Sequence, residues 1–204
     1  MQYKYTDKLA IGIVTCNRQE FFNNLINSID QEFSDKLYVV NSGQKYTEYS
    51  DNIKVHQCVR NPTVVGIAKN ILLRNMLQNS PNAEWFFVLE DDITIIDNKV
   101  FDEYIDTAKV SGLIHGQLSY GLHGLYSNVK QDGTPDTKYL VNYNSKNVAV
   151  YKESFAAFTL FHRSTFSNLG PNLFDERYLN AAEHLDLHHR CYKSGLGTPF
   201  WNIS

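Results

Sequence analysis

Three consecutive carboxylates, Glu90, Asp91 and Asp92, directly follow the uncharged, mostly bulky run 85–89. A continuous apolar run predicts a strand that is buried on both faces of a sheet. Its carboxyl end is where an open α/β sheet binds ligands. Three adjacent acids repel one another, which predicts a cation such as Mg²⁺ or Mn²⁺ that links carboxylates to substrate phosphates. An acidic turn that merely ends the strand is the alternative.

A second group of titratable side chains lies near the end of the sequence. Asn180 and Glu183 form a capping-box pattern that predicts a helix start near residue 180, and Gly195 predicts its end. His184 and His188 are four residues apart, a spacing that can hold a metal on one helix face. A histidine at the edge of the core and a solvated one are the alternative interpretation of this pair.

The first half of the chain must position the three acids. Its short apolar segments alternate with segments of helical periodicity, a pattern typical of βαβ units. Asn17 and Glu20 form another capping-box pattern, which predicts that the first helix begins at Asn17. The sequence therefore predicts an α/β fold with a mostly parallel sheet flanked by helices. Strands are expected at 9–14, 37–40, 53–59 and 85–90, and helices at 17–29 and 66–77.

The second half of the chain differs in texture. A helix is predicted over 100–110, followed by loops and short antiparallel strands over 113–161. The glycine-containing stretch 121–145 lacks periodicity and predicts a mobile cover over the ligand site. A strand at the end of this region, a short helix over 164–169 and the histidine-containing helix complete the expected order.

Composition limits the classes of function. The 204 residues suit a single domain, and a formal net charge of −3 argues against a broad nucleic-acid surface. Three widely spaced cysteines favour reduced thiols rather than a zinc site. No apolar run approaches the length of a membrane span, so a cytoplasmic protein is expected. Abundant Asn, Lys and Tyr indicate an AT-rich genome, that of a bacterium or a phage.

The order of motifs resembles the family-2-like glycosyltransferases with the GT-A fold. IGIVTCNR (11–18) is similar to the opening signature of that family, whose loop lies along the nucleotide. NPTVVGIAKNILLRN (61–75) is similar to its Asn…Gly-x-Ala…Asn helix, and VLEDDI (88–93) to its DXD-type motif. The late segment 161–196 resembles the block that ends in Glu-Asp-x-Asp-Leu. The resemblance implies one domain, with a nucleotide-sugar-binding half (1–97) and an acceptor-binding half (98–204).

The resemblance also implies roles for individual residues. Asp92 is the implied metal ligand, and Asp91 reaches the ribose or the metal through water. Glu90 contacts the donor sugar or only ends its strand. Asn41 stands where the family usually has a base-binding Asp. The other implied nucleotide- or phosphate-binding residues are Thr15, Asn17, Arg18 and Lys69.

In the late block, the Glu-Asp pair of the family is Glu183-His184 in this chain. His184 therefore stands where relatives place the general base, and an imidazole can accept the proton of an acceptor hydroxyl. Glu183 and Asp186 would stabilise its protonated form. The implied activity is metal-dependent, inverting transfer from a nucleotide sugar, most often a UDP-sugar, to a glycan or to a hydroxymethylated base in phage DNA. A nucleotidyltransferase and an inactive nucleotide-sugar-binding relative are the alternatives.

Overall fold

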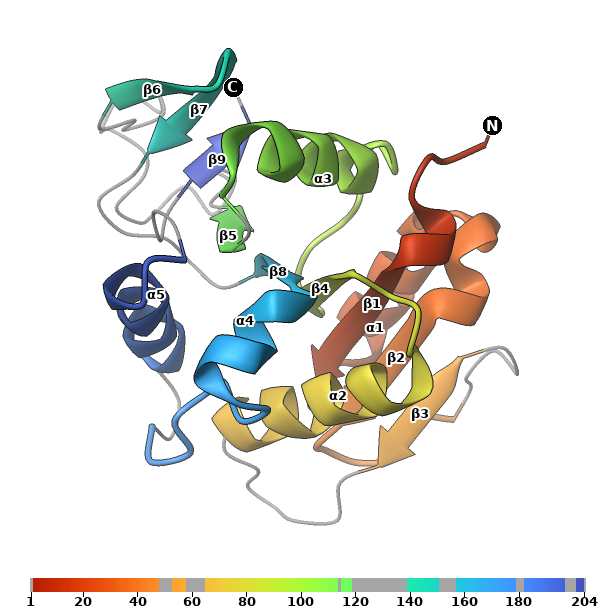
Figure 1. Ribbon diagram of the computed structural model, residues 1–204. Coiled ribbons are helices and arrows are strands. Elements are labelled where there is room, and N and C mark those ends of the chain that lie inside the picture. Colours follow the sequence, from red (N-terminus) through yellow and green to blue (C-terminus); the bar gives the residue numbers. More distant parts are fainter. Residues whose placement is uncertain are drawn as a thin grey trace, which may run out of the picture.

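The computed structural model describes residues 2–47, 53–57, 65–113, 115–118, 139–150, 157–178, 182–196 and 201–203. A six-stranded sheet in the order β3-β2-β1-β4-β8-β5 forms its centre (Figure 1). Strands β1 to β4 are parallel, and β8 is antiparallel to its neighbours β4 and β5. The predicted mostly parallel sheet is confirmed. Its strands are β1 (Leu9–Thr15), β2 (Leu37–Asn41), β3 (Lys54–Gln57), β4 (Trp85–Glu90), β5 (His115–Leu118) and β8 (Phe158–His162).

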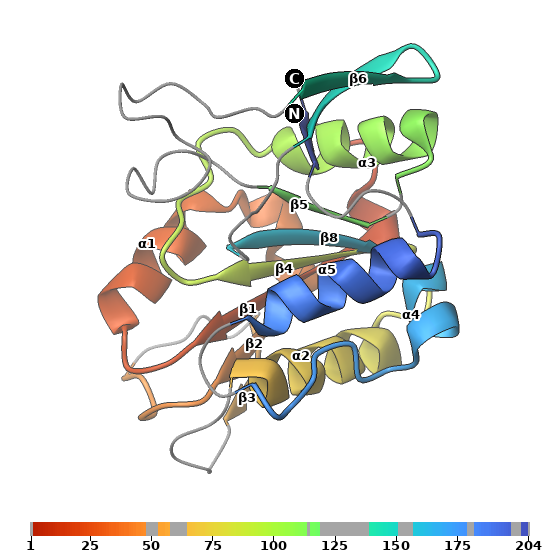
Figure 2. The same cartoon turned by 90° about the vertical axis from the view of Figure 1, so that its left-hand side faces the viewer.

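Helices cover both faces of this sheet (Figure 2). One face packs against α1 (Gln19–Ser28), the 3₁₀ helix η2 (Gln31–Lys36) and α3 (Val100–Ser111). The other face packs against α2 (Val65–Asn79), α4 (Arg163–Leu169) and α5 (Glu183–Lys193). Successive residues of β4 alternate between the two cores, which explains why its apolar run is continuous. A further 3₁₀ helix, η1 (Thr6–Lys8), precedes β1.

Side chains of α2 pack directly on Gly12 of β1, which has no side chain of its own to hold them away. A Cβ atom built at Gly12 would lie 2.5 Å from the Met76 sulfur and 2.7 Å from Leu72 Cδ2. The helix predicted over 66–77 is confirmed, and its apolar residues Ala68, Leu72 and Met76 are buried. The buried side of α2 is wide, since Lys69, Asn70 and Leu73 are buried as well. The cause is a second neighbour, because the segment around residue 174 also packs on α2 and hydrogen-bonds Asn70.

A second, antiparallel sheet contains β6 (Tyr139–Tyr143), β7 (Lys146–Val150) and β9 (Trp201–Ile203) and lies beside α3 (Figure 1). It confirms the short antiparallel strands expected in the second half. Residues 119–138 and 151–156 are outside the described part of the chain, so a mobile cover over 121–138 stays a prediction. The end of the predicted stretch 121–145 is instead ordered as β6 and the turn that follows it, because it pairs with β7. In the described ranges, no helix combines the length and the hydropathy that crossing a bilayer requires.

Candidate active site

The candidate site begins where β1 and β4 end. From β1 the chain continues to β2 on one side, whereas β4 lies on the other side, so the strand order reverses here. Open α/β sheets bind ligands at such a reversal, beyond the carboxyl ends of the strands. The last residue of β1, Thr15, donates a hydrogen bond from Oγ1 to Oδ2 of Asp91 at 2.6 Å. Asp91 is fully buried, and burial raises the pKa of its carboxyl group.

Arg18 joins the two aspartates of the acidic motif. Its guanidinium forms ion pairs with Asp91 and with Oδ2 of Asp92, the latter at 3.2 Å. The sequence predicted that a cation would offset the repulsion between these acids. In this structure that cation belongs to the protein itself, and Arg18 reaches the acids from the start of α1.

The first helix begins at Gln19 with Arg18 as its N-cap, so the predicted start at Asn17 with a capping box was wrong. Asn17 has a left-handed backbone, with φ of 56°. Its side-chain oxygen accepts a hydrogen bond from the Gln44 backbone N–H at 2.7 Å instead of capping the helix. A Cβ atom at Gly43 would lie 2.3 Å from that oxygen, so only glycine permits this close approach of the two loops.

Tyr46, which the sequence did not single out, connects these loops to the aspartates. The Arg18 backbone N–H donates to the Tyr46 hydroxyl at 2.9 Å, and that hydroxyl lies 2.6 Å from Thr15 Oγ1. Since the Thr15 proton is given to Asp91, Tyr46 is the donor to Thr15. The resulting chain of hydrogen bonds fixes Asp91 at the base of the site.

Asn41, expected to contact a nucleotide base, is fully buried at the end of β2. Its side-chain oxygen accepts from the Gly43 backbone N–H, and its Nδ2 donates to the Gln44 carbonyl, both at 2.8 Å. The amide therefore closes the turn in this structure, and contact with a base stays a prediction.

Lys69 was expected to neutralise phosphate, but the structure places it inside the protein. The side chain of Lys69 is only 1% exposed. Its ammonium group lies 2.7 Å from Oε1 of Glu90 and 2.9 Å from Oε1 of Glu183. Burial alone would lower the pKa of Lys69, but the two carboxylates outweigh it and raise that pKa. Lys69 is thus a counter-ion for two acids rather than a free phosphate ligand.

Glu183 and His184 form the first turn of α5. The helix begins at Glu183, three residues later than predicted, and Asn180 lies outside the described residues. Burial alone would raise the pKa of Glu183, but His184 and Lys69 outweigh it and lower that pKa to about 2. The Nδ1 atom of His184 lies 3.6 Å from Oε1 of Glu183, and the imidazole is 15% exposed. The predicted position of His184 in the first turn is confirmed.

The lowered pKa of Glu183 predicts how the protein responds to acid. A depressed folded-state pKa adds stability above the ordinary value of 4.5 and loses it as pH falls toward about 2. Between about pH 5 and about pH 2, urea unfolding should show a steeper loss of unfolding free energy for the wild-type protein than for Glu183→Gln. Parallel curves for the two proteins would contradict the ionised, paired state of Glu183.

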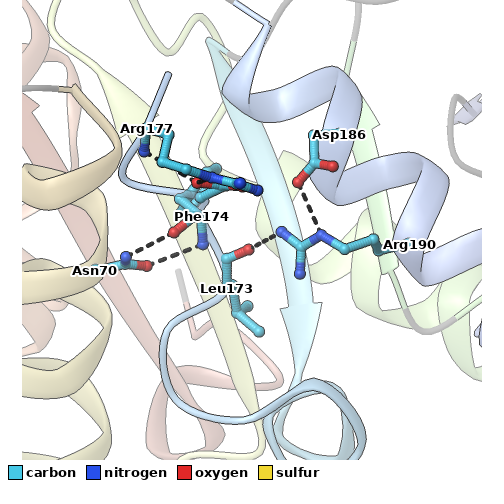
Figure 3. A network of polar contacts seen from close by, with 7 residues as sticks. Asn70, Leu173, Phe174, Arg177, Asp186 and Arg190 are labelled. Carbon is cyan, nitrogen blue, oxygen red and sulfur yellow. Dashed lines mark hydrogen bonds and ion pairs between the residues drawn. The ribbon is translucent and has the colours of Figure 1, made fainter. Parts of the chain in front are cut away.

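Asp186, which was expected to assist His184, is engaged elsewhere (Figure 3). Its Oδ2 accepts from Arg190 Nε at 2.8 Å, and the same guanidinium donates to the Leu173 carbonyl. Asn70 of α2 binds the backbone N–H and carbonyl of Phe174 next to it, at 2.9 and 2.8 Å. This network joins α2, the segment before α5 and α5 itself, so it holds the first turn of α5 in place.

The acidic motif suits a hard divalent ion. The Oδ1 atom of Asp92 is buried, and within the described ranges no group donates a hydrogen bond to it. Arg18 already stands beside Asp91 and Asp92 as a cation. The described residues contain no group of three or more His, Cys, Asp or Glu side chains that could hold a metal. Substrate phosphates and water would complete the shell, as is usual for Mg²⁺.

Comparisons with known proteins show the fold. No family model and no curated protein sequence matches the chain. It is similar to the structure of S. aureus TarS 1–349, with a TM-score of 0.57, 16% identity and coverage of 89% of this chain and 53% of that one. It is also similar to the mannosyltransferase PcManGT from Pyrobaculum calidifontis in complex with GDP-Man and Mn²⁺. There the TM-score is 0.53 and the identity 10%, with coverage of 89% and 52%.

The chain therefore spans about half the length of these two structures. At such low identity the similarity establishes architecture only. The protein has a GT-A-like fold, as its sequence motifs implied.

Proposed function

We propose that this protein is a metal-dependent glycosyltransferase that moves a sugar from a nucleotide-sugar donor to an acceptor hydroxyl with inversion. The observation that carries the proposal is the cluster of Thr15, Arg18, Asp91 and Asp92 at the reversal of strand order in a GT-A-like sheet. The similar mannosyltransferase was solved with GDP-Man and Mn²⁺, which is consistent with this use of the fold.

On the donor side, Asp92 would hold Mg²⁺ or Mn²⁺, with Asp91 behind it. A divalent ion at this place supplies Lewis-acid stabilisation of the diphosphate that departs. Arg18, which pairs with both aspartates in this structure, would also bind a phosphate oxygen, since its forked donor geometry suits that ligand. The adjoining loop with Thr15 and Asn17 would lie along the nucleotide, and Asn41 shapes the turn beside it.

On the acceptor side, His184 would take the proton of the attacking hydroxyl as general base. Glu183 is ionised and lies 3.6 Å from its Nδ1 atom, so it stabilises the imidazolium that results. Glu90 lies at the strand end, bound to Lys69, where it can also border the donor sugar. Asp186 acts indirectly, by holding Arg190 and thereby the start of α5.

We further propose a UDP-sugar as donor, and a glycan or a hydroxymethylated base in phage DNA as acceptor, in the cytoplasm of a bacterium or of a phage-infected cell. In this division of labour, residues 1–97 bind the donor and residues 98–204 the acceptor. The specificity for the nucleotide base and for the donor sugar would depend on contacts with the loops around the site. The specificity for the acceptor would depend on the second half of the chain.

A panel of nucleotide sugars with Mn²⁺ and without acceptor tests the activity, with released nucleoside diphosphate as the readout. Slow, metal-dependent release from one donor is the expected result, because GT-A glycosyltransferases can pass the sugar to water. A binding protein that has lost catalysis would bind the donor and release nothing. A nucleotidyltransferase would instead release pyrophosphate from a nucleoside triphosphate and a sugar phosphate. Either of these results would overturn the proposed activity.

A further inference from the structure

A buried cluster of charged side chains connects β4, α2 and α5 next to His184, the proposed general base. Its members are Glu90 at the end of β4, Lys69 of α2 and Glu183 of α5, and we call it the acid–lysine cluster. The Lys69 ammonium lies within 2.9 Å of both carboxylates. Side-chain exposures are 1% for Lys69, 5% for Glu183 and 27% for Glu90. Ion pairs this enclosed are screened little by water or salt.

The charges of this cluster do not cancel. Two carboxylates and one ammonium give −2 + 1 = −1, and the ion-pair geometry keeps all three groups ionised. His184 is the adjoining titratable group, with its Nδ1 atom 3.6 Å from Oε1 of Glu183. It also lies close enough to Glu90 to favour the ionised form of Glu90. When the imidazole takes a proton, the sum becomes −1 + 1 = 0. His188 and Cys191, further along α5, are two more buried titratable groups of this helix.

We propose that Lys69 is a positioning residue that sets the proton affinity of His184 by leaving one uncompensated negative charge next to it. This inference rests on the proposed role of His184 as general base. With both carboxylates and no lysine, the imidazole would face a charge of −2 and would hold its proton too strongly to act as a base. Without Glu183, the charges of Lys69 and Glu90 would cancel. The imidazolium formed during transfer would then lack its counter-ion.

The cluster also explains why Lys69 is buried although a buried ammonium is costly. Lys69 ties the first turn of α5 to the strand that ends in the acidic motif, and so it links the proposed base to the proposed metal ligands. Removal of one partner from a buried ion pair usually destabilises a protein strongly. Loss of Lys69 must therefore be distinguished from simple misfolding.

Three variants separate the charge effect from a structural one. Glu183→Gln leaves a cluster charge of −1 + 1 = 0, so the titration midpoint of His184 should fall. Lys69→Met leaves −2, so the midpoint should rise. The double variant leaves only Glu90 and returns the charge to −1, so its midpoint should lie near that of wild type. Each single shift is expected to be about one pH unit, as for a charge within about 4–6 Å.

The readout is NMR of ¹³C-labelled histidine in the whole protein, without substrate or metal. The sequence has seven histidines, and the signal missing in His184→Gln identifies residue 184. Lys193→Met removes an exposed charge from the last turn of α5, far from the cluster, and should leave the midpoint unchanged. Where an acceptor assay exists, the acid limb of the turnover profile should move with the midpoint.

Midpoints that move in the same direction for Glu183→Gln and Lys69→Met would overturn the inference. If Lys69→Met fails to fold, the comparison of Glu183→Gln with the double variant still decides, because the second substitution must raise the midpoint again. A double variant that stays at the lower value would contradict the proposal. Because this titration needs no turnover, the inference can fail while glycosyl transfer is confirmed, and the reverse is equally possible.

Discussion

Replacement of His184 with alanine is expected to lower turnover on the order of a hundredfold or more, with donor and metal binding intact. The imidazole lies in the first turn of α5 beside ionised Glu183, where it can take a proton and keep it near a counter-ion. The measurement is steady-state turnover with saturating donor and acceptor, together with calorimetric titration of donor and Mn²⁺. His184→Asp should recover part of the loss, since a carboxylate can also accept the proton.

A matched control lies on the same helix. His189 is exposed, so His189→Ala should keep turnover near that of wild type. Near-normal turnover in His184→Ala would exclude His184 as the base. A variant that fails only because it no longer binds metal would instead make His184 a metal ligand.

Replacement of Asp92 with alanine is expected to abolish metal-dependent donor binding while the fold persists. Asp92 supplies a buried oxygen that no described residue hydrogen-bonds, and Asp91 alone is a poor site because Arg18 and Thr15 already occupy it. The unfolding free energy without metal should change little, because the Arg18–Asp92 ion pair is partly exposed and such pairs contribute little.

Calorimetric titration of Mn²⁺ in the presence of donor measures this effect. Glu84→Ala is the control, because Glu84 precedes the same strand at its other end and pairs with exposed Lys8. Glu84→Ala should bind metal and donor as wild type does. Full donor affinity of Asp92→Ala in the presence of Mn²⁺ would show that the acidic motif does not hold the ion.

The fold could be predicted because the sheet is covered on both faces. Every residue of β1 is buried, so its apolar run carries no alternation that could be confused with an exposed strand. Helix ends were predicted less well. The capping-box pattern at Asn17 was overridden by a contact with Gln44, which lies 27 residues away and left no local signal.

The candidate site was predictable only in part. The acidic motif and His184 were found because their residue types and their order along the chain carry the information. Tyr46 gave no sequence signal, since it acts through a loop that folds back onto β1. Lys69 did leave a sequence signal, because it shares the buried side of α2 with Leu73 and Met76, which follow it by four and seven residues. A lysine at core spacing predicts a buried ion pair, but not which acids complete it.

Thermal unfolding of the wild-type protein with nucleotide sugars, each with Mn²⁺ and with a chelator, tests most directly whether this protein binds a donor through a metal. One donor should raise the melting temperature only when Mn²⁺ is present, and at about a hundred times its Kd it should add roughly 2.7 kcal/mol to the unfolding free energy. If no nucleotide sugar stabilises the protein, or if one does so equally in the chelator, metal-dependent donor binding at Asp91 and Asp92 is contradicted.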